Sequence, residues 1–284
     1  EMVQETNTYW DKDFIADNIG TTNRSSLTGD GITMAQAVGA DVTGMGYTQM
    51  MPISWIDDGN LAFGGGNYAI YINPTTGKRF VDETSERDVL SLAEFRNGIE
   101  HNGTKGVFIE LANASSKIPG PYLYGNEDVE WRQYVRTVDQ LAELFASLGL
   151  ETDADTVRAT IENYDKAVMA GEQPEGVKKT NPNALIGYAE KDESGNYLPE
   201  TYKLDGVELR VRFMAPSTHH TMGGIKVDTE RHALDAEDNV IPGLYAAGEV
   251  TGGIHGGNRL GGNAIVEIFV SGRTAAEAIQ ADNQ

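Results

Sequence analysis

The residues best suited to chemistry lie in three glycine-rich blocks near the end of the 284-residue chain. The first block is His219-His220-Thr221-Met222-Gly223-Gly224, the second surrounds Glu249, and the third contains Arg259. The planar guanidinium of an arginine can bind a carboxylate through two parallel hydrogen bonds, and a histidine can add a third contact or move a proton. Glycines allow the backbone to approach a flat cofactor ring closely. The blocks therefore indicate a place where the backbone lies close to a planar cofactor ring.

A helix must follow the third block. Asn263, Ala264 and Ile265 open an apolar segment with helical spacing that continues through Val266, Ile268 and Phe269. The first backbone N–H groups of a helix have no partner within it and carry a partial positive charge. We expect these amides to hold a ring carbonyl of a flavin and to stabilise negative charge on it.

Upstream segments predict a mixed α and β structure. The first thirty residues are polar and predict a helical segment followed by a loop. A turn at Gly29-Asp30-Gly31 precedes a second helix, and Asp30 either caps this helix or binds a ligand. Residues 68–81 predict a β-hairpin around the turn 74–77. Residues 138–148 and 157–168 have the apolar spacing of two amphipathic helices that end at Gly149 and Gly171. Residues 172–206 are loop-rich.

Composition narrows the function. Lys and Arg number 22 against 43 Asp and Glu, which gives a formal net charge of −21 and makes nucleic acid an improbable partner. The chain has no cysteine, which excludes disulfides and thiolate metal ligands in this segment, and we expect no metal site. It has no apolar run long enough to span a membrane. Composition does not decide between a cytoplasmic and an extracytoplasmic location.

The blocks in this order resemble the flavoprotein subunit of the fumarate reductase/succinate dehydrogenase family, in particular the soluble fumarate reductases and urocanate reductases. Thr28-Gly29-Asp30-Gly31, Gly77-Lys78-Arg79-Phe80-Val81 and Arg87-Asp88 extend the resemblance over nearly the whole chain. It implies an α+β capping domain attached to a partial α/β Rossmann-like FAD-binding domain. The expected segments are 1–44 (FAD-binding), 45–206 (capping, substrate-handling) and 207–284 (return to the FAD-binding domain). The family's N-terminal G-x-G-x-x-G loop is missing, so we expect an upstream segment to have been removed.

The resemblance also implies roles for single residues. Arg259 and His219 match the carboxylate clamp, and Arg87 matches the proton donor. His232 and His255 match no motif, and we expect them at the surface. The full sets are, for FAD, Asp30, His220, Glu249, Ala264 and Ile265, and for substrate, His219, Arg259, Gly262 and Met51.

Two departures concern the family's proton relay and its second carboxylate site. Ala62 and Gly65 occupy the positions where the family has the Glu and Arg of its proton relay, and Leu61 occupies the position of a substrate-binding Thr. The nearby acids that could replace the relay are Glu83, Glu86 and Asp88. Met51 replaces a histidine and cannot bind a second carboxylate. With Trp55 and Phe63 nearby, the distal pocket is expected to be apolar, which favours a monocarboxylate enoate over fumarate.

The resemblance therefore implies an FAD-dependent reductase that transfers a hydride to the C=C bond of an α,β-unsaturated carboxylate. Its partners would be this small substrate and an electron-donor domain or protein, with FMN or haem in segments outside this chain. Two alternatives remain open. One is a flavin dehydrogenase that introduces a C=C bond, as in relatives of the ketosteroid dehydrogenases, and the other is a non-catalytic flavin-binding fragment.

Overall fold

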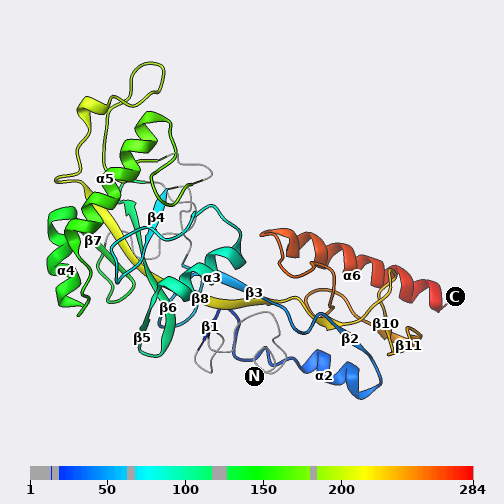
Figure 1. Cartoon of the computed structure of the whole chain (residues 1–284). Coiled ribbons are helices and arrows are strands. Elements are labelled where there is room, and N and C mark those ends of the chain that lie inside the picture. The colour runs from blue at the N-terminus through cyan, green and yellow to red at the C-terminus, as the bar shows by residue number, and fades with distance from the viewer. Residues whose placement is uncertain (1–13, 15–18, 63–67, 117–126, 180–183, 284) are drawn as a thin grey trace. The chain divides into compact units, whose positions relative to one another are not determined.

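The computed structural model describes residues 14, 19–62, 68–116, 127–179 and 184–283 (Figure 1). The chain forms two compact units. Unit 1 contains Glu1–Met50 and Thr218–Gln284, and unit 2 contains Met51–Ser217. The boundaries of the units lie inside two strands, β3 (Thr48–Trp55) and β8 (Glu208–Thr221).

An antiparallel sheet forms the centre of unit 2. Its long strands are β6 (Thr104–Asn113) and β8, which pair with Ile109 opposite Phe213. The strand β4 (Ala69–Ile72) lies on the other side of β6, and β7 (Gln133–Thr137) and β3 pair with β8. The short β5 (Ile99–His101) continues the pairing with β6. In unit 1 the end of β8 pairs with β1 (Gly20–Thr21).

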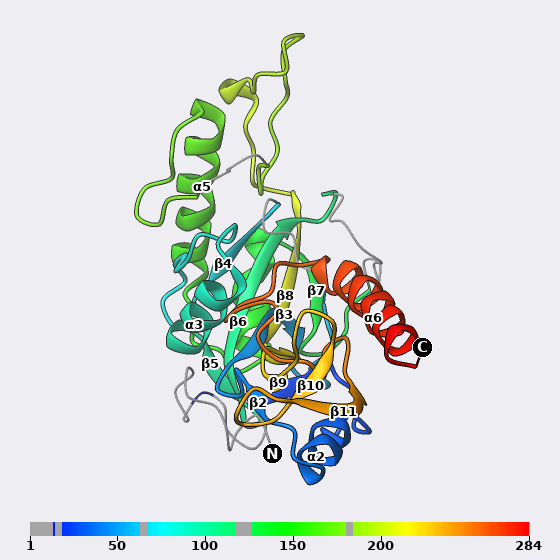
Figure 2. The same cartoon turned by 90° about the vertical axis from the view of Figure 1, so that its right-hand side faces the viewer.

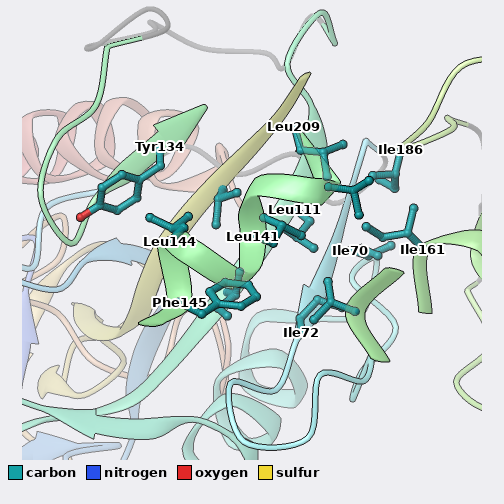
Figure 3. Close-up of a cluster of buried hydrophobic side chains, with 14 of the residues drawn as sticks. Ile70, Ile72, Leu111, Tyr134, Leu141, Leu144, Phe145, Ile161, Ile186 and Leu209 are labelled. Carbon is teal, nitrogen blue, oxygen red and sulfur yellow. The ribbon is translucent and has the colours of Figure 1, made fainter. Parts of the chain in front are cut away.

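Alternation along these strands gives the sheet two different faces. The first face is the main apolar core, where Ile70, Leu111 and Leu209 meet side chains from two helices (Figure 3). These helices are α4 (Leu141–Ser147), which follows the 3₁₀ turn η1 (Val138–Gln140), and α5 (Ala154–Ala170). They contribute among others Leu144, Phe145 and Ile161, all buried.

The ends of α5 explain why the periodicity identified this helix. Asp153 at its N-cap accepts a hydrogen bond from the backbone N–H of Thr156 at 3.2 Å, and Gly171 ends the helix in the left-handed conformation with φ 69°. The predicted helices in 138–148 and 157–168 are therefore confirmed. The loop-rich stretch 172–206 contains, among its described residues, one short 3₁₀ turn, η2 (Pro199–Thr201).

The second face of the sheet is covered by α3 (Arg87–Asn97). An apolar cluster there includes Trp55 from β3, Tyr71 from β4, Phe108 from β6 and Leu90 from α3. Buried charges share this face, because Glu110 and Arg212 alternate with the apolar residues of β6 and β8 and form an ion pair.

The predicted hairpin at 68–81 is only partly correct. The turn exists, with the Asn73 N–H bonded to the Lys78 carbonyl at 2.9 Å, and Ile72 faces Arg79 across one antiparallel bridge. Residues 78–81 do not continue as a strand. The main partner of β4 is β6, some thirty residues later, with Ile70 opposite Leu111, because β6 offers a longer apolar edge.

The described part of unit 1 contains the helices α2 (Asp30–Ala37) and α6 (Asn263–Asp282) and two small strand pairs (Figure 2). α2 packs Ile32 and Ala35 against an apolar cluster with Ile225 and Ala233. The strand pairs are β2 (Val42–Thr43) with β9 (Gly224–Ile225), and β10 (His232–Leu234) with β11 (Val240–Tyr245). The last element is α6, which confirms the helix predicted to begin at Asn263. No helix among the described residues is long and apolar enough to cross a membrane.

Candidate functional site

Gln49 binds Arg259 through two hydrogen bonds, and both residues belong to unit 1. The side-chain carbonyl of Gln49 accepts a hydrogen bond from Nη2 of Arg259 at 3.0 Å, and the Gln49 amide donates to the Arg259 backbone carbonyl. The same amide donates to Oδ1 of Asn258 at 3.2 Å. Gln49 is 1% exposed and Arg259 6%, so β3 fixes both the loop and the direction of the guanidinium. Sequence reasoning missed Gln49, since a lone buried amide has no motif.

The guanidinium of Arg259 keeps binding capacity for a ligand. Its Nε is buried and has no hydrogen-bond partner among the described residues. Burial lowers the pKa of Arg259 and the carboxylate of Glu249 raises it, but a guanidinium remains charged at neutral pH. Leaving such a donor unsatisfied in a buried place costs free energy, so the arrangement fits an anionic partner.

His219 is oriented by Thr22. Nδ1 of His219 lies 2.6 Å from Oγ1 of Thr22, and the Asn23 amide donates to the His219 backbone carbonyl at 2.9 Å. The Thr22 hydroxyl also lies 3.5 Å from the Thr218 carbonyl, a much longer contact. The short contact with Thr22 fixes the orientation of the His219 ring.

His220 faces a different environment from His219, as adjacent residues of a strand point to opposite faces. His220 is 7% exposed, and its Nε2 lies 3.9 Å from Oε2 of Glu249. Burial lowers the pKa of His220, Glu249 raises it, and Arg259 lowers it further. Its Nδ1 is buried without a hydrogen-bond partner among the described residues. The ring of His255 packs against it edge to face, with centroids 5.7 Å apart.

His255 and His232 were expected at the surface, but both are at least partly buried. His255 is partly buried beside His220, and its Nε2 is buried without a partner in the described part of the chain. His232 is 7% exposed and joins Asp228 to Asp282, with distances of 2.8 Å from Nδ1 and 2.9 Å from Nε2. Both expectations were wrong because a single histidine carries no sequence signal for the partners that its tertiary neighbours supply.

The N-terminus of α6 is open. Gly262 is its N-cap with φ 88°, no side chain caps the helix, and a methyl group built at Gly262 would meet nothing within 4 Å. Ile265 donates its backbone N–H to the Gly262 carbonyl at 3.3 Å, and Ala264 lies between them in the first turn. The uncapped start of α6, with free space beside it, fits a carbonyl group of a cofactor ring. The unsatisfied Nδ1 of His220 is a second polar group that such a cofactor could contact.

Not every glycine of the tail belongs to such a cradle. Methyl groups at Gly223, Gly224 and Gly252 would collide with the backbone of Gly44, Val250 and Thr43. These glycines are required because segments of unit 1 pass in direct backbone contact, which corrects the interpretation of all the tail glycines as cofactor contacts. Gly262, in the third block, has room beside it and keeps that interpretation.

Asp30 does not cap α2. The cap is Gly29 with φ 83°, and Asp30 is the first residue of the helix, where its Oδ1 accepts a hydrogen bond from the Thr28 hydroxyl at 2.6 Å. A carboxylate in the first turn is favourable for the helix dipole without capping it. Asp30 is exposed and so accessible to a ligand.

Arg87 lies in unit 2 as the first residue of α3 and is partly exposed. The residue before it, Glu86, is the exposed N-cap and makes no side-chain cap. Of the residues said to replace the family's relay, Ala62 is buried in the apolar cluster under α3, and Gly65 lies outside the described residues.

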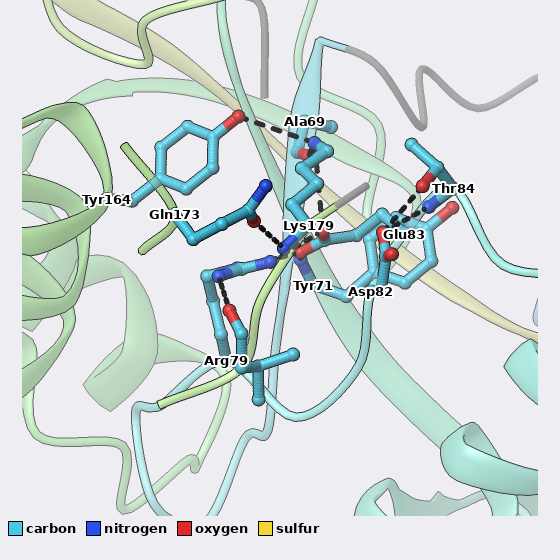
Figure 4. A network of polar contacts seen from close by, with 10 residues as sticks. Ala69, Tyr71, Arg79, Asp82, Glu83, Thr84, Tyr164, Gln173 and Lys179 are labelled. Atoms are coloured by element: carbon cyan, nitrogen blue, oxygen red, sulfur yellow. Dashed lines mark hydrogen bonds and ion pairs between the residues drawn. The ribbon is translucent and has the colours of Figure 1, made fainter. Parts of the chain in front are cut away.

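Glu83 is committed to a structural network and is therefore a poor relay (Figure 4). Its Oε1 accepts hydrogen bonds from the backbone of Tyr71 at 2.9 Å and from Nε of Arg79 at 3.0 Å. Its Oε2 accepts from Nη2 of Arg79 at 2.9 Å and lies 3.6 Å from Nζ of Lys179. Lys179, fully buried, also donates to the Ala69 carbonyl at 2.8 Å. The network joins β4 to the segment before residue 180.

Met51, the first residue of unit 2, is 3% exposed on β3. Strand alternation places Met51 on the same side as Ile53 and Trp55, both of which belong to the apolar cluster under α3. Phe63, the other residue expected to make this region apolar, lies outside the described residues.

Comparison with known proteins identifies the family of this chain. Residues 16–265 match the family described as FAD binding domain. NADH:acrylate oxidoreductase of Vibrio harveyi is 38% identical over 98% of this chain, and fumarate reductase (cytochrome) of Shewanella frigidimarina is 34% identical over 90%. The chain spans only 25% and 40% of the length of these two relatives.

A solved structure agrees in fold. The open conformation of a flavocytochrome c3 fumarate reductase superposes with a TM-score of 0.67 at 28% identity, over 98% of this chain and 44% of that protein. This likeness supports the expected fold, a capping domain attached to part of an FAD-binding domain. Because the family match covers most of the sequence, the chain belongs to the FAD binding domain family, and its cofactor is FAD.

Proposed function

We propose that the protein containing this chain reduces the C=C bond of an α,β-unsaturated monocarboxylate. The observation that carries the proposal is the buried guanidinium of Arg259, fixed by Gln49 and still offering an unsatisfied Nε to an anion. FAD, when bound and reduced, supplies the hydride. His220, Glu249 and the first turn of α6 would hold it, together with Asp30, Ala264 and Ile265.

The carboxylate is bound by unit 1 in this proposal. Arg259 provides a fixed cation, and His219, oriented by Thr22, adds a second contact. Gly262 leaves space at the loop that carries Arg259. Holding the carboxylate withdraws electrons from the conjugated double bond and orients it, which lowers the barrier to addition of a hydride.

In this proposal Arg87 provides the proton, and the surroundings of Met51 set a preference for an apolar substituent. Arg87 protonates the second carbon of the double bond. Met51 offers no charge for a second carboxylate, and the side chains on its side of β3 are apolar. We therefore expect acrylate, or acrylates with alkyl or aryl substituents, to be better substrates than fumarate. The relation to an acrylate oxidoreductase supports the same choice.

The test uses the full-length protein loaded with FAD and reduced chemically. Reduced flavin is mixed with acrylate, crotonate, cinnamate or fumarate, and reoxidation is followed by absorbance. Fast reoxidation by the monocarboxylates supports the proposal, whereas rapid reaction with fumarate alone refutes the substrate class. Replacement of Arg87 by Ala should abolish reduction, and unchanged reduction would exclude Arg87 as the acid. Oxidation of saturated acids without any reduction of enoates would favour a dehydrogenase.

A further inference from the structure

The interior of unit 2 contains a carboxyl group that the proposed function does not use. Glu94 on α3 is fully buried, and neither of its carboxyl oxygens has a hydrogen-bond partner among the described residues. Ser91, one turn earlier on the same helix, is also fully buried with an unsatisfied hydroxyl. Groups of this kind are rare in native proteins because each costs free energy to bury, so three such oxygens together need an explanation.

The serine is unusual for a helix. A buried serine normally donates to the carbonyl four residues earlier, as Ser271 does to the Glu267 carbonyl at 2.7 Å on α6. Ser91 makes no such bond. Its hydroxyl is therefore available to a water molecule or to a neighbouring side chain, which it can serve both as donor and as acceptor.

Helix geometry places these residues in line with Arg87. Arg87, Ser91 and Glu94 follow at i, i+4 and i+7, the spacing of one helix face. Seven residues correspond to a rise of about 10 Å. Side chains of a helix lean toward its N-terminus, so the carboxyl group of Glu94 leans toward Ser91 and Arg87. The hydroxyl of Ser91, one carboxyl oxygen of Glu94 and a bound water molecule are enough to bridge the distance from Glu94 to Arg87.

The surroundings of Glu94 favour its uncharged form. Burial raises the pKa of Glu94 well above its usual range and so favours the protonated carboxyl group. Charged and titratable groups among the described residues on this face of the sheet are Glu110 of β6, Arg210 and Arg212 of β8 and the Tyr71 hydroxyl of β4. Glu110 and Arg212 neutralise each other, with the Arg212 Nε donating to Glu110 at 2.5 Å. Glu94 has no cation of its own among the described contacts.

An acid is needed at this place if Arg87 donates a proton. A guanidinium that has given its proton to carbon is a strong base, with an ordinary pKa above about 12, and must regain a proton before the next turnover. A carboxylic acid is more acidic than this even when burial raises its pKa, so transfer from Glu94 to Arg87 is downhill. Glu83 is occupied by Arg79 and Lys179, and Glu86 is exposed.

We propose that α3 carries a proton relay in which Glu94 returns a proton to Arg87 through Ser91 and bound water. This inference rests on the proposed function. In the step, the O–H bond of the Glu94 carboxyl breaks, the Ser91 hydroxyl passes a proton on while receiving one, and an N–H bond forms on the neutral guanidine of Arg87. Glu94 is left as a carboxylate and takes a proton back from solvent water. No electrons are exchanged.

The discriminating variant is Glu94→Gln. The amide has nearly the shape of the neutral acid and no charge, so unit 2 should fold with an unchanged melting temperature, but it cannot lose a proton to Arg87. In full-length, FAD-loaded, prereduced protein, the first turnover with acrylate should keep its rate, because Arg87 begins protonated. Steady-state turnover should fall at least about tenfold. Glu94→Asp should restore part of it, and Glu143→Gln, an exposed helical glutamate of the same unit, should change neither phase.

A second measurement does not depend on turnover. Infrared spectroscopy of the 284-residue chain should show the C=O band of a protonated carboxyl group at neutral pH, and this band should disappear in Glu94→Gln. Equal steady-state rates in the wild-type protein and Glu94→Gln would overturn the relay, as would a first turnover slowed as much as the later ones. If the wild-type protein reduces no enoate, the proposed function fails, and the absence of the infrared band would then refute a protonated Glu94 independently.

Discussion

The side-chain carbonyl of Gln49 accepts a hydrogen bond from the guanidinium of Arg259 at 3.0 Å, while the Gln49 amide donates to the backbone carbonyl of the same arginine. One neutral side chain thus orients a cation without neutralising its charge. An acidic residue in the place of Gln49 would orient the guanidinium equally well but would compete with a substrate carboxylate for it.

Gln49→Glu tests this relationship. The new carboxylate should pair with Arg259 and reduce kcat/KM for an enoate by about tenfold or more, mainly through KM. A neutral enoate amide should be much less affected, because it has no charge to lose. The measurement is steady-state kinetics of the full-length protein with both substrates. Equal losses for the acid and the amide would show that the variant acts by disturbing the loop.

Thr22→Val tests the orientation of His219. Without the hydroxyl, Nδ1 of His219 loses the contact at 2.6 Å, and the ring is no longer held in a fixed orientation. We expect KM for the enoate to rise about five- to tenfold, the equivalent of one hydrogen bond of about 1 kcal/mol. Thr22→Ser keeps the hydroxyl and should behave like the wild-type protein. A serine variant as impaired as the valine variant would contradict this role for the hydroxyl.

Glu83→Ala tests the buried network of unit 2. Removal of the carboxylate leaves Arg79 and Lys179 as buried cations without their anion, which should lower the free energy of unfolding by about 3–5 kcal/mol. Denaturant unfolding of the chain measures this change in the free energy of unfolding. Asp205→Ala removes an exposed partner of Arg158 and should have a far smaller effect. Comparable losses in the two variants would refute the structural role of Glu83.

His232 should make the attachment of the end of α6 depend on pH. Its hydrogen bonds to Asp228, and then to Asp282, raise the pKa of His232 above its ordinary value of about 6.5. The stabilisation is therefore fully present below that ordinary value and is lost as the pH rises through the raised, folded-state pKa. The hydrogen-exchange protection of the last turn of α6, measured relative to the intrinsic exchange rate at each pH, should fall over that interval. In His232→Gln this pH dependence should be absent.

Periodicity and caps predicted the helices well because their signals are local. The apolar spacing and the terminal glycine of α5 lie within one segment of sequence. The partner of β4 could not be found in this way, since pairing Ile70 with Leu111 depends on a strand distant in sequence. The same limit applies to the site. Arg259 and His219 were proposed from motifs. Gln49, Thr22 and Glu94 enter the proposals only because folding brings or keeps them beside other groups.

The crowding of some tail glycines and the openness of others decides how mutagenesis of this region can be interpreted. A side chain at Gly224 or Gly252 would push two backbone segments apart, so loss of flavin in such variants would report damage to the fold. Gly257 is different, because a methyl group there meets only the ring of Tyr47 at an ordinary distance of 3.6 Å. An alanine at Gly257 would therefore be silent in the empty protein, and any defect it caused would measure how closely the cofactor approaches the chain.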